Sequence, residues 1–210
     1  MPMHASAADF VPPDADTLDT LRDAVQDCRG CPLHERATQA VFGEGDADAR
    51  VVLVGEVPGD QEDRKGRPFV GPAGRLLDDA LKAAELDREG AYVTNAVKHF
   101  SWEPRGKRRL HKRPRANEID ACRPWLQAEL GLLSPDVVVC LGATAAQAAF
   151  GKIVRFGDYL GDFHPTPLFE TTFFTRHPSA ILRIREDPDR ERAFQAFVDD
   201  LAKVRQRLTG

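Results

Sequence analysis

The chain contains four short runs of apolar residues, rich in valine or phenylalanine. Runs of this kind, which are continuous rather than alternating with polar residues, are typical of parallel strands that are buried on both faces. The pattern therefore predicts four core strands, at residues 51–54, 91–97, 136–141 and 171–175.

Between and around these runs, apolar residues recur at spacings of three and four, which is typical of helices with one buried face. Helices are predicted at residues 17–27, 75–86, 116–133, 142–150 and 189–208. Thr17 is a suitable N-cap for the first of them. Because strands alternate with helices, we expect an α/β fold of three layers, in which a four-stranded parallel sheet is covered by helices on both faces.

The 210 residues suit a single domain, which we place at residues 17–210. Residues 1–16 are rich in Ala, Asp and Pro and are expected to form a flexible tail without an apolar signal core. No apolar run approaches the roughly 20 residues of a membrane helix. These features predict a cytoplasmic monomer that does not associate with membranes.

The net charge of the chain is -4, which does not indicate a strongly basic nucleic-acid-binding protein. The distribution of charge matters more than its sum, and basic residues cluster at 107–115. By itself this stretch is typical of a solvated basic loop or a localisation signal, but its position after the strand that carries Asn95 favours a patch that contacts phosphates.

Three loops follow predicted strands, at residues 55–74, 95–115 and 176–183. In open α/β sheets the ligand crevice lies past the carboxyl ends of the strands, so these loops are expected to converge on one site. The first loop carries Glu56 and Phe69, and its glycines permit a flat ligand to approach the backbone. It has neither of the common glycine patterns that bind phosphates.

Four cysteines are present, of which Cys28 and Cys31 form a C-x-x-C pair. In a chain without a secretion signal such a pair points to a metal, a cluster or redox chemistry, with two unligated thiols as an alternative. Thioredoxin-type chemistry is disfavoured because the pair precedes the first strand. Cys140 lies within a predicted core strand, where cysteine usually acts as a small apolar residue.

The segment from Gly55 to Gly74 resembles motif A of the family 4 uracil-DNA glycosylases, whose pattern is approximately G-E-x-P-G…E-D…G-x-P-F-V-G-x-A-G-x-L-L. The segment His177-Pro-Ser179 resembles motif B of the same family. The resemblance implies a uracil-DNA glycosylase-like fold and the excision of free uracil from uracil-containing DNA, with single-stranded DNA favoured. It implies substrate contacts by Gly55, Val57, Asp60, Phe69, Asn95 and Ser179.

The resemblance also implies roles for individual side chains. Phe69 stacks on the extruded base, and Asn95 reads its polar edge. Glu56 stabilises the cationic sugar, and His177 donates a hydrogen bond to the departing base. For Asn95, a structural hydrogen bond to neighbouring backbone is the alternative.

The same resemblance implies a [4Fe–4S] cluster, which the family holds with four cysteines. This chain keeps Cys28, Cys31 and Cys122, and it has His99 in place of the third cysteine of the family. Histidine ligates iron in Rieske centres, so we expect these four residues to be the ligands. Cys140 is the rival fourth ligand, and a zinc site is the alternative to a cluster.

The run from Lys107 to Lys112 resembles the Lys-Arg-Arg-Ile-His-Lys insertion of the X-type uracil-DNA glycosylases (UdgX), a branch of this family. In that branch the inserted histidine becomes covalently joined to the DNA, which implies that His111 attacks C1′ of the sugar. The chain departs from the branch at Val57, where glutamine is expected. The basic residues expected to contact phosphates are Lys107, Arg108 and Arg109. A turnover glycosylase and a non-catalytic Fe–S or zinc nucleic-acid-binding module are the alternatives.

Overall fold

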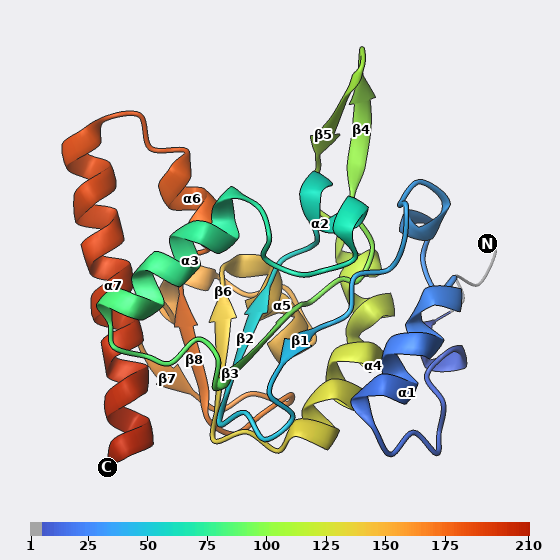
Figure 1. Ribbon diagram of the computed structural model, residues 1–210, viewed down its shortest axis with the longest axis horizontal. Helices are drawn as coiled ribbons and strands as arrows, with labels where there is room; N and C mark the ends of the chain where they lie inside the picture. The colour runs from blue at the N-terminus through green and yellow to red at the C-terminus, as the bar shows by residue number, and fades with distance from the viewer. Residues whose placement is uncertain (1–5) are drawn as a thin grey trace.

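The computed structural model describes residues 6–210 and contains a main sheet flanked by helices (Figure 1). The strand order is β1-β3-β2-β6-β8-β7. The four central strands run parallel to one another, and each lies within two residues of a strand predicted from the apolar runs. They are β3 (Ala91–Asn95), β2 (Val51–Gly55), β6 (Val137–Leu141) and β8 (Thr172–Thr175).

The sheet is larger and less uniform than the four-stranded parallel sheet expected from the sequence. β1 (Glu44–Gly45) pairs antiparallel with β3, and β7 (Phe163–His164) pairs antiparallel with β8, so the sheet is mixed and has six strands. Both added strands are two residues long and lie at the edges, and neither contains a buried residue. Short edge strands of this kind have no apolar run by which the sequence could reveal them.

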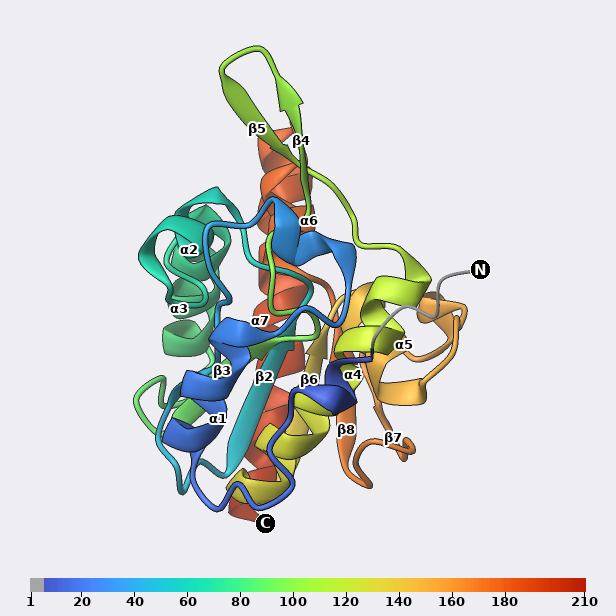
Figure 2. The ribbon, with the colours of Figure 1, turned by 90° about the vertical axis from the view of Figure 1, so that its right-hand side faces the viewer.

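Helices cover both faces of the sheet (Figures 1 and 2). One face carries α1 (Leu18–Ala24), α4 (Ala116–Leu133) and α5 (Ala143–Phe150). The other carries α3 (Pro72–Ala83), α6 (Pro178–Leu182) and α7 (Asp187–Thr209). Successive residues of β2 point to alternate faces, with Val52 and Val54 in the first core and Val51 and Leu53 in the second. Burial on both faces explains why the central strands are continuously apolar.

Several short elements complete the chain. They are α2 (Asp60–Lys65) and the 3-10 helices η1 (Ala7–Asp9), η2 (Val25–Asp27), η3 (Pro32–Glu35) and η4 (Phe156–Asp158). Two helices begin earlier than predicted, α3 at Pro72 and α7 at Asp187. Each has a proline in its first turn, where the fixed φ of proline favours helix initiation. Among the described helices, none is both long and apolar enough to cross a bilayer.

Part of the expected N-terminal tail, residues 1–5, lies outside the described residues. From residue 6 onward the chain packs against the domain, and Ala7 is buried in the core that α4 also lines. A Cβ atom at Gly30 would lie 2.6 Å from the backbone nitrogen of Ala7, so this close approach requires glycine. The N-terminal segment therefore packs directly on the C-x-x-C turn.

The basic stretch after β3 contains a hairpin within what was expected to be a loop. β4 (Trp102–Arg105) pairs antiparallel with β5 (Arg108–His111), and Figures 1 and 2 show this hairpin projecting beyond the carboxyl edge of the main sheet. Gly106 in its turn has a φ of +58°, which glycine adopts without strain. The strands are mostly exposed and include Pro104, so they lack the apolar alternation that predicts a strand.

Candidate active site

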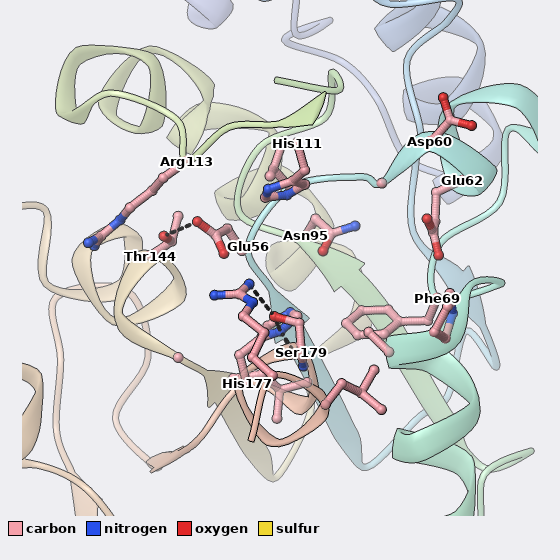
Figure 3. Close-up of a pocket in the computed structure, with 18 of the residues that line it drawn as sticks. Glu56, Asp60, Glu62, Phe69, Asn95, His111, Arg113, Thr144, His177 and Ser179 are labelled. Atoms are coloured by element: carbon pink, nitrogen blue, oxygen red, sulfur yellow. Dashed lines mark hydrogen bonds between the residues drawn. The ribbon is translucent and has the colours of Figure 1, made fainter. Parts of the chain in front are cut away.

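A pocket of about 720 Å³ opens at the carboxyl edge of the sheet, next to the hairpin (Figure 3). All three loops that were expected to converge contribute side chains to it. The expected site residues that line it are Glu56, Val57, Asp60, Phe69, Asn95, His111, His177 and Ser179. The carboxyl ends of parallel strands share one edge of a sheet, which is why residues so distant in sequence meet here.

Glu56 directly follows β2, and a side chain that the sequence analysis did not single out orients its carboxylate. The hydroxyl of Thr144 donates a hydrogen bond to Oε1 of Glu56 at 3.0 Å. Thr144 is buried in the first turn of α5. The backbone of Glu56 is also fixed, because its carbonyl accepts a hydrogen bond from the N–H of Val97. One threonine in a helix of small residues gives no sequence signal for such a contact.

His177 is the N-cap of α6, and its neighbours determine which ring nitrogen carries the proton. Its Nδ1 accepts a hydrogen bond from the N–H of Ser179 at 3.1 Å and lies 2.8 Å from the Ser179 hydroxyl. A backbone N–H can only donate, so Nδ1 is unprotonated and the neutral ring carries its proton on Nε2. The pKa of His177 is lowered to about 4, mainly by burial, and the charges of Arg183 and His111 act in the same direction. At neutral pH the ring is therefore a neutral hydrogen-bond donor.

Phe69 forms a wall of the pocket from an unusual backbone conformation. Its φ is +54°, in the left-handed region that residues other than glycine rarely adopt. A Cβ atom at Gly74 would lie 1.7 Å from the carbonyl oxygen of Phe69, so α3 packs directly on this peptide. Glu62 accepts a hydrogen bond from the N–H of Gly71 at 2.7 Å and ties α2 to the same loop. The Phe69 ring stacks near that of His177, with 6.3 Å between ring centroids.

Asn95 ends β3 and is supported from behind by tight packing and a buried ion pair. A Cβ atom at Gly55 would lie 2.4 Å from Oδ1 of Asn95 and 2.6 Å from the Phe69 ring, so Gly55 lies behind both side chains rather than lining the pocket. The ammonium of Lys98 donates to the carbonyl of Asn95 at 2.9 Å and to the carboxylate of Glu129 at 2.7 Å. Both charged side chains are fully buried, and a buried ion pair is stable only when its remaining polar atoms are also hydrogen-bonded. The hydrogen bond from Lys98 to the carbonyl of Asn95 meets this need and holds the end of β3 in place.

His111 ends β5 and enters the pocket from the side opposite His177 (Figure 3). Its ring centroid lies 6.0 Å from that of Phe100, and the side chain remains exposed at the pocket mouth. Partial burial against the pocket walls lowers the pKa of His111, and the charge of Arg183 lowers it further, whereas Glu56 acts in the opposite direction. The lowered pKa favours a neutral imidazole at neutral pH, in which one ring nitrogen has a free lone pair.

Arg109 anchors the hairpin to the domain. Its guanidinium donates to Asp60 at 2.5 Å and to Asp63 at 2.6 Å, and it lies over the rings of Phe100 and Trp102. Only 16% of its side chain is exposed. The guanidinium of Arg109, which was expected to contact the DNA backbone, thus binds two carboxylates of α2 instead. This contact holds the hairpin so that His111, two residues further on, lies at the pocket.

The other two basic residues expected at the DNA lie away from the pocket. Lys107 is exposed in the hairpin turn, and Arg108 is exposed at the start of β5. Two arginines that the sequence analysis did not assign, Arg113 and Arg183, line the pocket instead. Arg183 donates to the Ser179 hydroxyl at 2.9 Å, so its charge is held close to His177.

Three of the four expected cluster ligands are buried thiols, and hydrogen-bond donors are directed at the sulfur atoms of two of them. The indole N–H of Trp125 donates to Sγ of Cys28 at 3.2 Å, and the backbone N–H of Lys98 donates to Sγ of Cys122 at 3.3 Å. The pKa of Cys31 is raised to about 11 and that of Cys122 to about 12, mainly by burial, and the charges of the neighbouring thiols act in the same direction. Such thiols become ligands when a cationic metal centre compensates their charge.

The fourth expected ligand, His99, is buried beside this group. Burial lowers its pKa to about 4, so its ring is neutral and has a lone pair for a metal. Within residues 6–210, no three His, Cys, Asp or Glu side chains form a group that could hold a metal ion. That finding concerns a single ion, whereas the ligands of a four-iron cluster are spread around a larger body. For Cys140 in β6, burial is the cause of its raised pKa, with no contribution from the other thiols.

Comparison with known proteins relates the pocket to a family. Residues 42–202 match the family model described as the uracil DNA glycosylase superfamily. A type-4 uracil-DNA glycosylase of Thermotoga maritima is 37% identical over 187 residues, which cover 84% of this chain and 94% of that protein. A type-4 uracil-DNA glycosylase of Saccharolobus solfataricus is 32% identical over 202 residues, which cover 92% of this chain and 88% of that protein. The family match includes every pocket residue and begins after the C-x-x-C pair.

Proposed function

This chain belongs to the uracil DNA glycosylase superfamily, and we propose on that premise that it excises uracil from DNA. The observation that carries the proposal is the convergence of four side chains on one pocket. A carboxylate, a neutral histidine donor, an amide and an aromatic wall are what cleavage of an N-glycosidic bond requires from an enzyme. They are Glu56, His177, Asn95 and Phe69.

Recognition of uracil rests on the rigid part of the pocket. An extruded base stacks on Phe69 while its polar edge meets the side-chain amide of Asn95. Gly55 has no side chain behind these two groups, and Lys98 fixes the backbone of Asn95. Both contacts are therefore in place before the base arrives, so that little binding energy is lost to reorganisation.

Departure of the base is assisted by His177. Uracil leaves as an anion whose charge lies largely on its carbonyl oxygens, and a fixed neutral N–H donor stabilises that charge as it develops. The hydrogen bond from Ser179 to Nδ1 fixes the proton on Nε2 of His177. Glu56 supplies the negative charge that stabilises the cationic sugar left behind.

We further propose that His111 captures the sugar. The bond between C1′ and N1 breaks with its electron pair on uracil, and a ring nitrogen of neutral His111 forms a bond to C1′. The alkylated ring then loses its remaining N–H proton to solvent, and the uracil anion takes up a proton. The resemblance of the hairpin to the X-type insertion supports this step, as does the lowered pKa of His111.

A turnover glycosylase is the second candidate, and one observation favours it. His111 is exposed at the pocket mouth, so water reaches the same side of the sugar. In that case water takes the place of the imidazole and the products are free uracil and abasic DNA.

The hairpin also contributes to binding of the DNA strand. Lys107 and Arg108 lie free on its exposed part and contact phosphates of the single strand that enters the pocket, while Arg109 keeps the hairpin on α2. Because His111 of the hairpin lines the pocket, the hairpin leaves more room there for a flexible single strand than for a rigid duplex.

We propose that Cys28, Cys31, Cys122 and His99 hold a [4Fe–4S] cluster. Three buried thiols, two of which accept hydrogen bonds from N–H donors, and one neutral imidazole are chemically suited to it. A bound cluster supplies structural cross-linking between the N-terminal segment, α4 and the base of the hairpin.

Release of uracil from a single-stranded uracil-containing oligonucleotide tests the excision proposal. The wild-type protein is expected to release uracil, and Glu56→Gln to release it at least ~10²-fold more slowly, which is the scale for loss of one catalytic group. Glu170→Gln, an exposed glutamate in a loop that does not line the pocket, is the matched control and is expected to behave as wild type. An undiminished rate in Glu56→Gln would show that the site is misassigned.

A further inference from the structure

We propose that Thr144 is a positioning residue that holds the Glu56 carboxylate in its reactive orientation. The inference rests on the proposed role of Glu56 in uracil excision. The Thr144 hydroxyl donates to Oε1 of Glu56 at 3.0 Å, and a carboxylate can only accept, so the hydroxyl proton points at Glu56. Thr144 is 3% exposed, and burial protects this hydrogen bond from competition by water.

The start of α5 is itself fixed against the other side of the pocket. Gly142 is the N-cap of α5 with a φ of +90°, and its N–H donates to the carbonyl of Thr175 at 2.8 Å. A Cβ atom at Gly142 would lie 2.9 Å from Cβ of His177. Thr144 therefore stands on backbone that is anchored to the end of β8, immediately beside the loop that carries His177. The first turn of α5 therefore fixes the position of Glu56 relative to His177, which donates to the departing base.

The contact leaves one carboxylate oxygen for chemistry. Oε1 of Glu56 is engaged by Thr144, and Figure 3 shows the carboxylate between Thr144 and His111. Oε2 makes no hydrogen bond among the described residues and remains available to the sugar. Without the hydroxyl, the carboxylate rotates freely about its terminal bonds, and the fraction of molecules in the reactive geometry falls. Binding of DNA does not depend on this orientation, so the loss is expected in the chemical step.

The test compares one variant that loses the hydroxyl of Thr144 with one that keeps it. Thr144→Val keeps the shape of the side chain and removes the donor, and Thr144→Ser keeps the donor and removes a methyl group. Under single-turnover conditions with enzyme in excess, Thr144→Val is expected to release uracil about tenfold or more slowly, the scale for losing a hydrogen bond to a charged group. Affinity for the oligonucleotide should stay within about twofold of wild type. Thr144→Ser should recover most of the rate.

A double-mutant cycle separates positioning from a general loss of structure. If Thr144 acts through Glu56, the Glu56→Gln variant should lose no further activity when Thr144→Val is added. Thr172→Val provides the control, because it removes a buried hydroxyl that bonds the carbonyl of Phe169 at the opposite end of the sheet. Should Thr144→Val prove unstable, Thr144→Ala removes the same donor and is expected to be equally slow.

Specific outcomes overturn the inference. Wild-type rates in both Thr144→Val and Thr144→Ala would do so, as would an effect of Thr144→Val that adds fully to that of Glu56→Gln. Either result would leave the proposed function standing provided that Glu56→Gln is slow. Failure of the wild-type protein to release uracil would instead remove the proposed function itself.

Discussion

At the residue scale, His177 shows how local contacts determine the chemistry of a side chain. The sequence places it after a strand and before a proline, which identifies a residue at the carboxyl edge of the sheet. Its tautomer depends on the N–H of Ser179, and its neutrality depends on burial in the assembled pocket. The second property arises from residues brought together only by the fold, so the sequence pattern could predict the position of His177 but not its protonation state.

The lowered pKa of His177 predicts a pH dependence of stability. An unfolded histidine titrates near pH 6.5, whereas the pKa of His177 in the folded protein is about 4. Between these values the unfolded chain binds a proton that the folded chain does not, so stability falls as the pH is lowered from 6.5 towards 4. Over that range wild type should lose on the order of 2 kcal/mol more unfolding free energy than His177→Asn, as measured by denaturant titration. Equal losses in the two proteins would contradict the assignment.

Thr144 and Glu129 illustrate residues that sequence reasoning could not find. Both lie in regular helices, where neither periodicity nor a motif distinguishes them from their neighbours. Their importance comes from a partner on another element, Glu56 for Thr144 and Lys98 for Glu129. Contacts of this kind depend on how α4 and α5 pack on the sheet, which the local sequence does not specify.

At the element scale, the hairpin is the largest departure from the expected fold. Its charged sequence led to a functional hypothesis, which stays a prediction, and it gave no sign of paired strands. The conformation depends on Arg109, whose carboxylate partners Asp60 and Asp63 lie more than 40 residues earlier in the chain. A long-range anchor of this kind converts a basic stretch into an ordered arm that holds His111.

The anchor predicts that Arg109→Lys separates sugar capture from excision. Lysine keeps the charge but cannot donate to Asp60 and Asp63 together through a planar fork, so the hairpin and His111 become less well placed. Formation of the covalent adduct should slow by about tenfold, while uracil release slows less because Glu56 and His177 are untouched. The two rates can be measured on the same samples by denaturing electrophoresis and by quantifying free uracil.

Arg105→Lys is the matched control for this prediction, because Arg105 is exposed on the same hairpin and makes no contact with α2 among the described hydrogen bonds and ion pairs. It should retain the wild-type ratio of adduct to released uracil. An unchanged ratio in Arg109→Lys as well would mean that the anchor does not position His111.

At the scale of the whole molecule, the central sheet and the place of the site could both be predicted from the sequence. The four central strands are buried throughout and rich in apolar residues because helices cover both faces, so the signal was strong where burial is complete. The pocket followed from topology, because parallel strands bring their carboxyl ends to one edge. Edge strands β1 and β7 are half-exposed and two residues long, and they left no such signal.

The proposed cluster predicts the colour and composition of the whole protein. After anaerobic purification it should be brown and contain about four irons per chain. Cys122→Ala should lose the iron and much of the thermal stability, because the cysteine joins α4 to the base of the hairpin. Cys140→Ala and His99→Cys should both retain iron. Stoichiometric zinc in place of iron would refute the cluster.

The central claim is that this pocket excises uracil and that His111 captures the resulting sugar. Its most direct test is denaturing electrophoresis of wild type and His111→Ser after incubation with single-stranded uracil-containing DNA, with free uracil quantified in parallel. Wild type should give a shifted protein–DNA band and about one uracil per chain, and mass spectrometry should find a deoxyribose remnant on the peptide that contains His111. His111→Ser should give no shifted band but many uracils per chain, because water then takes the place of the imidazole. A shifted band that persists in His111→Ser, or a remnant on another residue, would contradict capture by His111, and absence of uracil release from wild type would contradict the account as a whole.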